Sequence, residues 1–277
     1  MNLFSKKNVF CTFAPMMRPS NTTTIAIAIL TVCVLSACRT TYHIGNIERK
    51  RIVIDNRYDP LIPTSANKIV DTYRVRIDSI TRKVIAHATH DMSEEPPGGE
   101  LANLCADFMV WAAHELGDSC EIGIYNMGGI RASLQQGPIT VGDALQVLPF
   151  ANTISCCILR GSTLMDLFKQ MAASGGQAVS RGVRMEIDAH GNLLSATFQG
   201  QRIDTTALYR IATIDFLAQG NDKMEALTRH VEYRNIADTR NDTRTLWTTF
   251  LRETTDKNGR LLTDTVPRVI RHTSTTP

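Results

Sequence analysis

Apolar residues recur every three or four positions in two segments of the chain, and this spacing predicts amphipathic helices. The segments are residues 65–80 and 100–116, in which the apolar side chains share one helical face. Gly117 stands where a glycine commonly ends a helix. A further helix is expected over residues 162–171.

Short apolar runs between these segments predict strands. They cover residues 83–88, 122–125, 153–159, 184–187, 193–198 and 209–213, and residues 51–55 are a candidate first strand or part of a tether. The mixture of helices and strands predicts an α+β fold.

The first forty residues have the organisation of a secretory signal. Three basic residues precede an apolar run over residues 25–35, which is too short to span a bilayer as a helix. The run leads into Leu-Ser-Ala-Cys at positions 35–38, which resembles the bacterial lipobox, where the cysteine is acylated. We therefore expect residues 1–37 to be a lipoprotein signal peptide, and Cys38 to anchor the protein in the bacterial cell envelope, periplasmic or outer-membrane. A signal cut at a nearby site and a membrane anchor are the alternatives.

The composition is that of a globular protein. The chain has 277 residues, of which 43% are hydrophobic and 21% charged, and a formal charge of +3. Residues 1–37 contain three basic and no acidic residues, so the remaining chain is formally neutral. This balance gives no general positive field for nucleic acid. We expect a polar tether over residues 38–60 and one domain over residues 61–277.

Besides Cys38, the expected mature chain keeps Cys105, Cys120, Cys156 and Cys157. An envelope location permits disulfides. Neighbouring residues of a strand point to opposite faces, so a bond between the vicinal pair at 156 and 157 would be strained. We favour buried free thiols for this pair and leave the disulfide status of all four open.

A strand followed by Asn-x-Gly-Gly-Ile-Arg, at residues 126–131, can form a ligand-binding turn. Gly128 and Gly129 permit a close backbone approach. Asn126 supplies a donor and an acceptor, and Arg131 supplies a planar fork that matches phosphate or carboxylate. Taken alone, such a turn is common on protein surfaces.

Three further segments come after this turn in order. They are Gly-Pro-Ile-Thr at residues 137–140, Leu-Pro-Phe-Ala-Asn at 148–152 and Asp-Phe-Leu-Ala-Gln-Gly-Asn-Asp at 215–222. The ordered set resembles the C-terminal, substrate-specificity domain of the 5′-nucleotidase family, and it covers most of the expected mature chain.

The resemblance implies a four-layer α/β/β/α fold that binds a nucleotide. Phe150 and Phe216 would clamp the nucleobase, Asp222 would contact the ribose, and Asn126 and Arg131 would meet the substrate near its phosphate and base. Stacking a base on an aromatic ring contributes about 1–3 kcal/mol. The alternative for each phenylalanine is an ordinary core residue.

The sequence departs from the family pattern at two places. Asn221 replaces the second of two glycines before Asp222, and asparagine tolerates the left-handed conformation that such a turn uses. Residues 96–99 read Pro-Pro-Gly-Gly, where many relatives carry an arginine of the phosphate site.

Complete 5′-nucleotidases resemble metallophosphoesterases in their first half, where two metal ions activate water. The chain lacks the ordered series of Asp-x-His, Gly-Asp and Gly-Asn-His clusters that such a site needs. Asp-x-His occurs once, at residues 188–190, Gly-Asp occurs at 117–118 and 142–143, Gly-Asn-His does not occur, and the histidines are scattered. His87 and His90 are the nearest pair, and beyond Asp91 they lack a flanking carboxylate at the spacing of a zinc site. No nucleophile motif is present. We expect no catalytic residue and no metal or other cofactor in this chain, with a divalent metal only in a separate metallophosphoesterase subunit.

The sequence therefore predicts the nucleotide-binding, substrate-recognition half of a 5′-nucleotidase-type hydrolase, inactive alone, which binds a nucleoside monophosphate or related nucleotide and no nucleic acid. One alternative is a nucleotide- or nucleoside-binding envelope lipoprotein without hydrolase activity. Another is a structural lipoprotein that has lost the ligand. The preferred base and the oligomeric state stay open.

Overall fold

The structure is a computed structural model that describes residues 63–273 together with Thr22, Ile25 and Arg57. Cys38 and the candidate strand at 51–55 lie outside the described residues. The chain divides into two units, Met1–Ile62 and Pro63–Pro277. Within the described residues, no helix combines the length and the apolar character needed to cross a membrane.

The helices described in the second unit include the three that the sequence predicts, each within two residues of its expected bounds. They are α2 (Thr64–Thr81), α3 (Glu100–Glu115), α4 (Val141–Val147), α5 (Gly161–Ala173), α6 (Asp215–Ala218) and α7 (Thr243–Glu253), with 3₁₀ turns η2 (Met127–Gly129) and η3 (Glu225–Arg229). Gly117 adopts φ +81° just after α3, as expected for a glycine that ends a helix. Thr140 and Asp143 form a capping box that starts α4.

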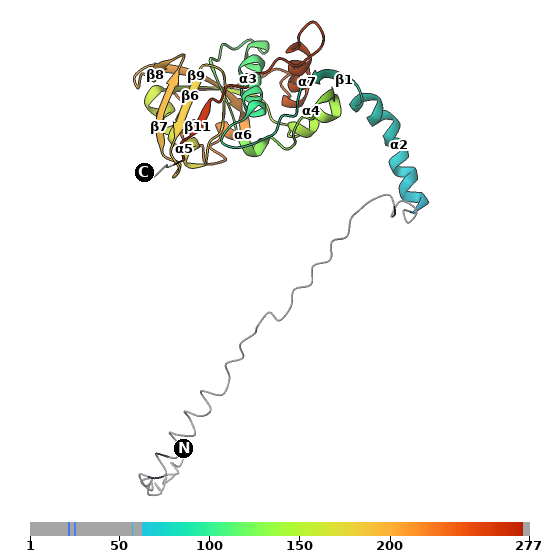
Figure 1. Ribbon diagram of the computed structural model, residues 1–277, viewed down its shortest axis with the longest axis horizontal. Helices are drawn as coiled ribbons and strands as arrows, with labels where there is room; N and C mark the ends of the chain where they lie inside the picture. Colours follow the sequence, from blue (N-terminus) through green and yellow to red (C-terminus); the bar gives the residue numbers. More distant parts are fainter. Residues whose placement is uncertain (1–21, 23–24, 26–56, 58–62, 274–277) are drawn as a thin grey trace, which may run out of the picture. The chain divides into compact units, whose positions relative to one another are not determined.

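The strands form three sheets within the described region. They are β1 (Val84–Ala88), β2 (Ile122–Tyr125), β3 (Gly137–Thr140), β4 (Ile154–Arg160), β5 (Ala178–Val179), β6 (Val183–Ile187), β7 (Leu193–Phe198), β8 (Gln201–Arg202), β9 (Leu208–Ile214), β10 (Glu232–Asn235) and β11 (Val269–Arg271). The sheet orders are β10-β4-β9-β2-β5, β11-β6-β7-β8 and β1-β3. The α+β class is confirmed (Figure 1).

The core lies between the five-stranded sheet and the helices. Helix α3 packs on β2, β5 and β9, α7 packs on α3, and α5 contacts β4, β9 and β7. Phe108 of α3 and Trp247 of α7 meet edge to face with ring centroids 5.2 Å apart. Gly123 lets α3 lie close to β2, because a Cβ there would clash with the carbonyl oxygen of Ala106. Helices α3 and α5 thus pack against the sheet that carries the site.

The cysteines correct one expectation. Cys156 is bonded to Cys120, 36 residues away in sequence, so the preference for two free thiols is wrong for Cys156. Cys157 is free and buried, as expected. Cys105, for which the question was open, is also free and buried. Burial raises the pKa of the Cys157 thiol to about 12, which keeps it protonated and unreactive.

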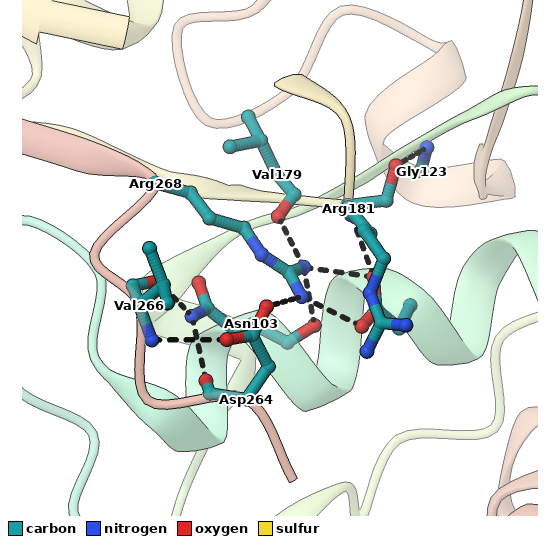
Figure 2. A network of polar contacts seen from close by, with 9 residues as sticks. Asn103, Gly123, Val179, Arg181, Asp264, Val266 and Arg268 are labelled. Carbon is teal, nitrogen blue, oxygen red and sulfur yellow. Dashed lines mark hydrogen bonds and ion pairs between the residues drawn. The ribbon is translucent and has the colours of Figure 1, made fainter. Parts of the chain in front are cut away.

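A buried arginine fastens the C-terminal segment to α3 (Figure 2). Arg268, whose side chain is 5% exposed, makes a two-pronged ion pair with Asp107 of α3 at 2.7 and 2.8 Å. It also donates to the carbonyls of Asn103 and Val179 at 3.2 and 3.1 Å and pairs with Asp264 at 3.1 Å. These bonds hold the segment that delivers β11 to β6.

Replacing Arg268 with Ala should lower the free energy of unfolding by about 3–5 kcal/mol, because it leaves Asp107 partly buried without its charge partner. Arg271→Ala is the matched control, since the Arg271 side chain is exposed and makes one hydrogen bond, to the Gly175 carbonyl, and its loss should cost less than about 1 kcal/mol. Urea denaturation measures both. Equal losses in the two variants would contradict this role for Arg268.

Candidate functional site

Three connections meet at one edge of the five-stranded sheet. β9 runs parallel to β2 and antiparallel to β4, so the carboxyl ends of β2 and β9 lie beside the amino end of β4. Asn126 follows β2, Phe216 follows β9, and Phe150 precedes β4. The sheet topology therefore gathers residues that are far apart in sequence.

These connections enclose a pocket of about 280 Å³. It is lined by Tyr125, Asn126, Gly128, Gly129, Phe150, Asn152, Ile214, Phe216 and Asp222. All the binding and turn residues expected from the sequence line it except Arg131. Tyr125, Asn152 and Ile214 are additions to the expected set. Asn152 lies in the Pro-Phe-x-Asn segment that carries Phe150, so its position in this motif could have identified it as a pocket residue from the sequence.

The two phenylalanines are not core residues. Phe150 is 47% exposed and Phe216 is 44% exposed, whereas Phe108 and Phe168 are fully buried. Exposing large apolar rings to water is unfavourable, and a ligand that covered the two rings would remove this cost. The arrangement suits a flat, apolar-faced ligand, and the core alternative for Phe150 and Phe216 is wrong.

Asn126 is held by Asp222. Its Nδ2 donates to Asp222 Oδ2 at 2.8 Å, which fixes the amide orientation, because the reversed amide would face oxygen with oxygen. Asn126 is buried, and its Oδ1 accepts no hydrogen bond from the described residues. Asp222 is exposed at the pocket and offers a carboxylate that accepts from hydroxyl groups.

The turn after β2 fits tightly around Gly129. A Cβ at Gly129 would lie 2.6 Å from Asn126 Oδ1 and 2.7 Å from Tyr125 Cε1.

Burial raises the pKa of the Tyr125 hydroxyl, and the neighbouring Cys105 raises it further, so this group stays protonated. Gln177 Oε1 accepts from the Met127 amide at 2.7 Å and orients the turn from outside the motif.

Buried polar residues from the start of α7 support the Phe150 connection. Thr243 donates from its backbone and its hydroxyl to the Asn152 carbonyl, at 3.1 and 2.6 Å. Asn241 accepts from the Ile154 amide at 2.7 Å and donates to the Ile154 carbonyl at 3.0 Å. Neither residue belongs to a recognisable motif, so the sequence gives no signal for them.

The loop after α6 forms its turn, but not through Asn221. The left-handed residues are Gly220, Asp222 and Lys223, at φ +83°, +56° and +63°. Asn221 instead donates through Nδ2 to the Phe216 carbonyl at 2.8 Å. The residue that departs from the family pattern thus ties Phe216 to its own loop.

Arg131 lies beside the pocket and outside its lining. Its Nη1 donates to the Gly128 carbonyl at 3.1 Å, and the side chain is exposed. A role for Arg131 at a phosphate stays a prediction.

His90 lies outside the pocket lining as well. Its Nε2 lies 2.6 Å from Glu100 Oε2 and its Nδ1 lies 2.9 Å from Thr89 Oγ1. Both ring nitrogens of His90 are therefore engaged within the protein.

One group of three metal-capable side chains occurs among residues 63–273, namely Asp118, Cys120 and Cys156. Two of them form the disulfide, and Asp118 pairs with Arg210 and Arg234. Two guanidinium groups at the carboxylate disfavour a cation there, so this group does not fit a metal ion.

The family model of the 5′-nucleotidase C-terminal domain matches residues 84–229. This match covers more than half of the chain and includes every pocket residue. The chain belongs to the 5′-nucleotidase C-terminal domain family.

Individual relatives agree with this assignment. The chain is 31% identical over 131 residues to a 5′-nucleotidase of Vibrio cholerae, which covers 46% of this chain and 24% of that protein. It is 31% identical over 142 residues to the trifunctional nucleotide phosphoesterase protein YfkN of Bacillus subtilis, covering 46% of this chain and 10% of that protein. The 5′-nucleotidase precursor of Thermus thermophilus superposes with a TM-score of 0.63 at 26% identity, covering 75% of this chain and 43% of that one. The chain therefore spans about a quarter or less of the two curated relatives.

Replacing Gly129 with Ala should lower the free energy of unfolding by about 1–3 kcal/mol, because Asn126 and Tyr125 must move to admit the new methyl group. Gly128→Ala is the control on the same turn, since its Cβ would meet Asn126 Nδ2 and Asp222 Oδ2 at the ordinary distances of 3.7 and 3.8 Å. Urea denaturation should show a change below about 1 kcal/mol for the control. If the two variants unfold alike, the turn is not packed as described.

Proposed function

We propose that the chain is the substrate-recognition half of a 5′-nucleotidase-type hydrolase and that it binds a nucleoside monophosphate or a related nucleotide. The observation that carries the proposal is one pocket with two exposed phenylalanine rings and the exposed Asp222 carboxylate. A nucleobase supplies a flat π surface for Phe150 and Phe216, and a ribose supplies hydroxyl donors for a carboxylate. Residues 84–229, which carry the pocket, match a domain family named for 5′-nucleotidases.

The hydrolytic step is assigned to a separate metallophosphoesterase chain. Phosphate ester hydrolysis at a two-metal site needs several carboxylate and histidine ligands, and the group found among residues 63–273 does not fit a metal ion. The subunits would share one substrate, with this chain holding the nucleoside. A stand-alone nucleotide-binding lipoprotein without hydrolase activity is the alternative.

The same proposal places the protein in the bacterial cell envelope through an acyl group on Cys38. It is supported by the apolar run at residues 25–35 and by the Leu-Ser-Ala-Cys sequence at its end. Metabolic labelling with palmitate should mark the wild-type chain and not Cys38→Ala, and equal labelling of both would contradict the anchor.

Adding residues 39–277 to the partner metallophosphoesterase should raise kcat/KM for AMP above that of the partner alone. The Phe150→Ala/Phe216→Ala variant should lose this gain, because the clamp is removed, whereas Leu194→Ala should keep it. Leu194 lies on β7 and is exposed, away from the pocket lining. Initial rates of phosphate release measure each mixture.

Two outcomes would count against the proposal. No gain over the partner alone would contradict the split hydrolase. A gain that survives in Phe150→Ala/Phe216→Ala would contradict the clamp as the recognition element.

A further inference from the structure

Helix α2 exposes a continuous apolar stripe. Ile69, Val70, Tyr73 and Ile77 lie on one face at helical spacing, and Ile69 and Ile77 are 66% and 53% exposed. No residue of α2 is buried. A stripe of this length on a folded domain marks an interaction surface.

The stripe has a basic border. At 100° per residue, Arg76 lies along one side of the stripe and Arg74 along the other, whereas Asp71 and Asp78 lie toward the opposite face. Arg74 pairs with Asp71 at 3.3 Å. Helix α2 contains three basic and two acidic side chains, and two further basic residues, Arg82 and Lys83, follow directly after it. The helix and these two residues together carry a formal charge of +3.

The domain contacts α2 through α4 near the C-terminal end of the helix, where Ile80 continues the stripe and is still 56% exposed. Ile80 lines a shallow hollow with Val141 and Leu145 of α4. The part that runs from Ile69 to Ile77 stays exposed.

We propose that α2 lies on the surface of an anionic lipid bilayer, with the stripe toward the acyl chains and Arg74 and Arg76 at the headgroup phosphates. An amphipathic helix with basic borders and low net hydrophobicity is the form that binds at such a surface. A second copy would bring the same basic border against itself, which like charges oppose.

The short distance in sequence between Cys38 and α2 supports a lipid bilayer as the partner of the stripe. Residues 39–62 span at most about 85 Å when fully extended, so an acyl group on Cys38 would hold α2 near the bilayer at a high effective concentration. The helix–lipid contact is independent of the nucleotide pocket, and the unacylated chain tests it apart from the anchor.

The test measures binding of unacylated residues 39–277 to vesicles; the unit Pro63–Pro277 is compact by itself. The vesicles contain phosphatidylcholine with about 30% phosphatidylglycerol, or phosphatidylcholine alone. Sedimentation should show binding that is stronger on the anionic vesicles and weakens with salt. Ile69→Ser/Ile77→Ser should bind at least tenfold more weakly, because the apolar contact is lost. Arg76→Gln should lose about fivefold, the equivalent of about 1 kcal/mol per basic residue near an anionic surface.

Val75→Ser is the matched control. Val75 is 78% exposed on the face opposite the stripe, and serine has a helix propensity close to that of the residues it replaces. Val75→Ser should bind vesicles like the unaltered chain, and circular dichroism should show the same helix content in every variant.

Three results would overturn the proposal. One is no binding to anionic vesicles. Another is an equal loss in Val75→Ser and Ile69→Ser/Ile77→Ser. The third is that the stripe variant abolishes self-association or activation of the metallophosphoesterase while vesicle binding is unchanged, which would make the stripe a protein-docking surface.

Discussion

The pairing of β9 with both β2 and β4 is the constraint on which the site depends. Because β9 is parallel to one neighbour and antiparallel to the other, two strands end and one begins at the same edge. Asn126, Phe150 and Phe216 come together there although they are far apart along the sequence. The strand order β4-β9-β2 differs from the order along the chain, so segments that meet at the pocket are separate in the sequence.

The rigidity of the pocket comes from residues around the motif. Asn241 and Thr243 hold the backbone after Phe150, Asn221 holds the carbonyl of Phe216, and Gln177 holds the turn after β2. Each of these bonds fixes the backbone close to a residue that lines the pocket. Holding apolar rings ready for a ligand reduces the ordering cost of binding. The start of α7 therefore contributes to the pocket although it lies far along the chain.

Much of the fold follows from local pattern. The strands at 122–125 and 193–198 agree with the expected bounds, since each is a short apolar run flanked by turn residues. Helix α7 is absent from the sequence prediction although Leu246, Trp247, Phe250 and Leu251 recur at helical spacing and Asp242 caps the helix. Its threonines have low helix propensity, which weakens this pattern. β10 is exposed throughout, so no alternation marks it in the sequence.

Most of the residues that line the pocket could be predicted, whereas the residues that support them could not. The motif order indicates Phe150, Phe216, Asn126 and Asp222. It does not indicate that Cys120 and Cys156 pair, since this depends on the distance between segments 36 residues apart in sequence. It also does not indicate that Asn221 leaves the left-handed position to its neighbours and bonds the Phe216 carbonyl within the same loop.

The proposed function depends above all on a nucleobase being held between Phe150 and Phe216. Calorimetric titration of AMP into residues 39–277 can decide this, with Phe216→Ala and Leu194→Ala measured beside the unaltered chain. We expect saturable binding that Phe216→Ala weakens by about 5–150-fold, equivalent to about 1–3 kcal/mol of base stacking, and that Leu194→Ala leaves unchanged. An AMP affinity that is the same in Phe216→Ala as in the unaltered chain would show that the clamp does not hold the base.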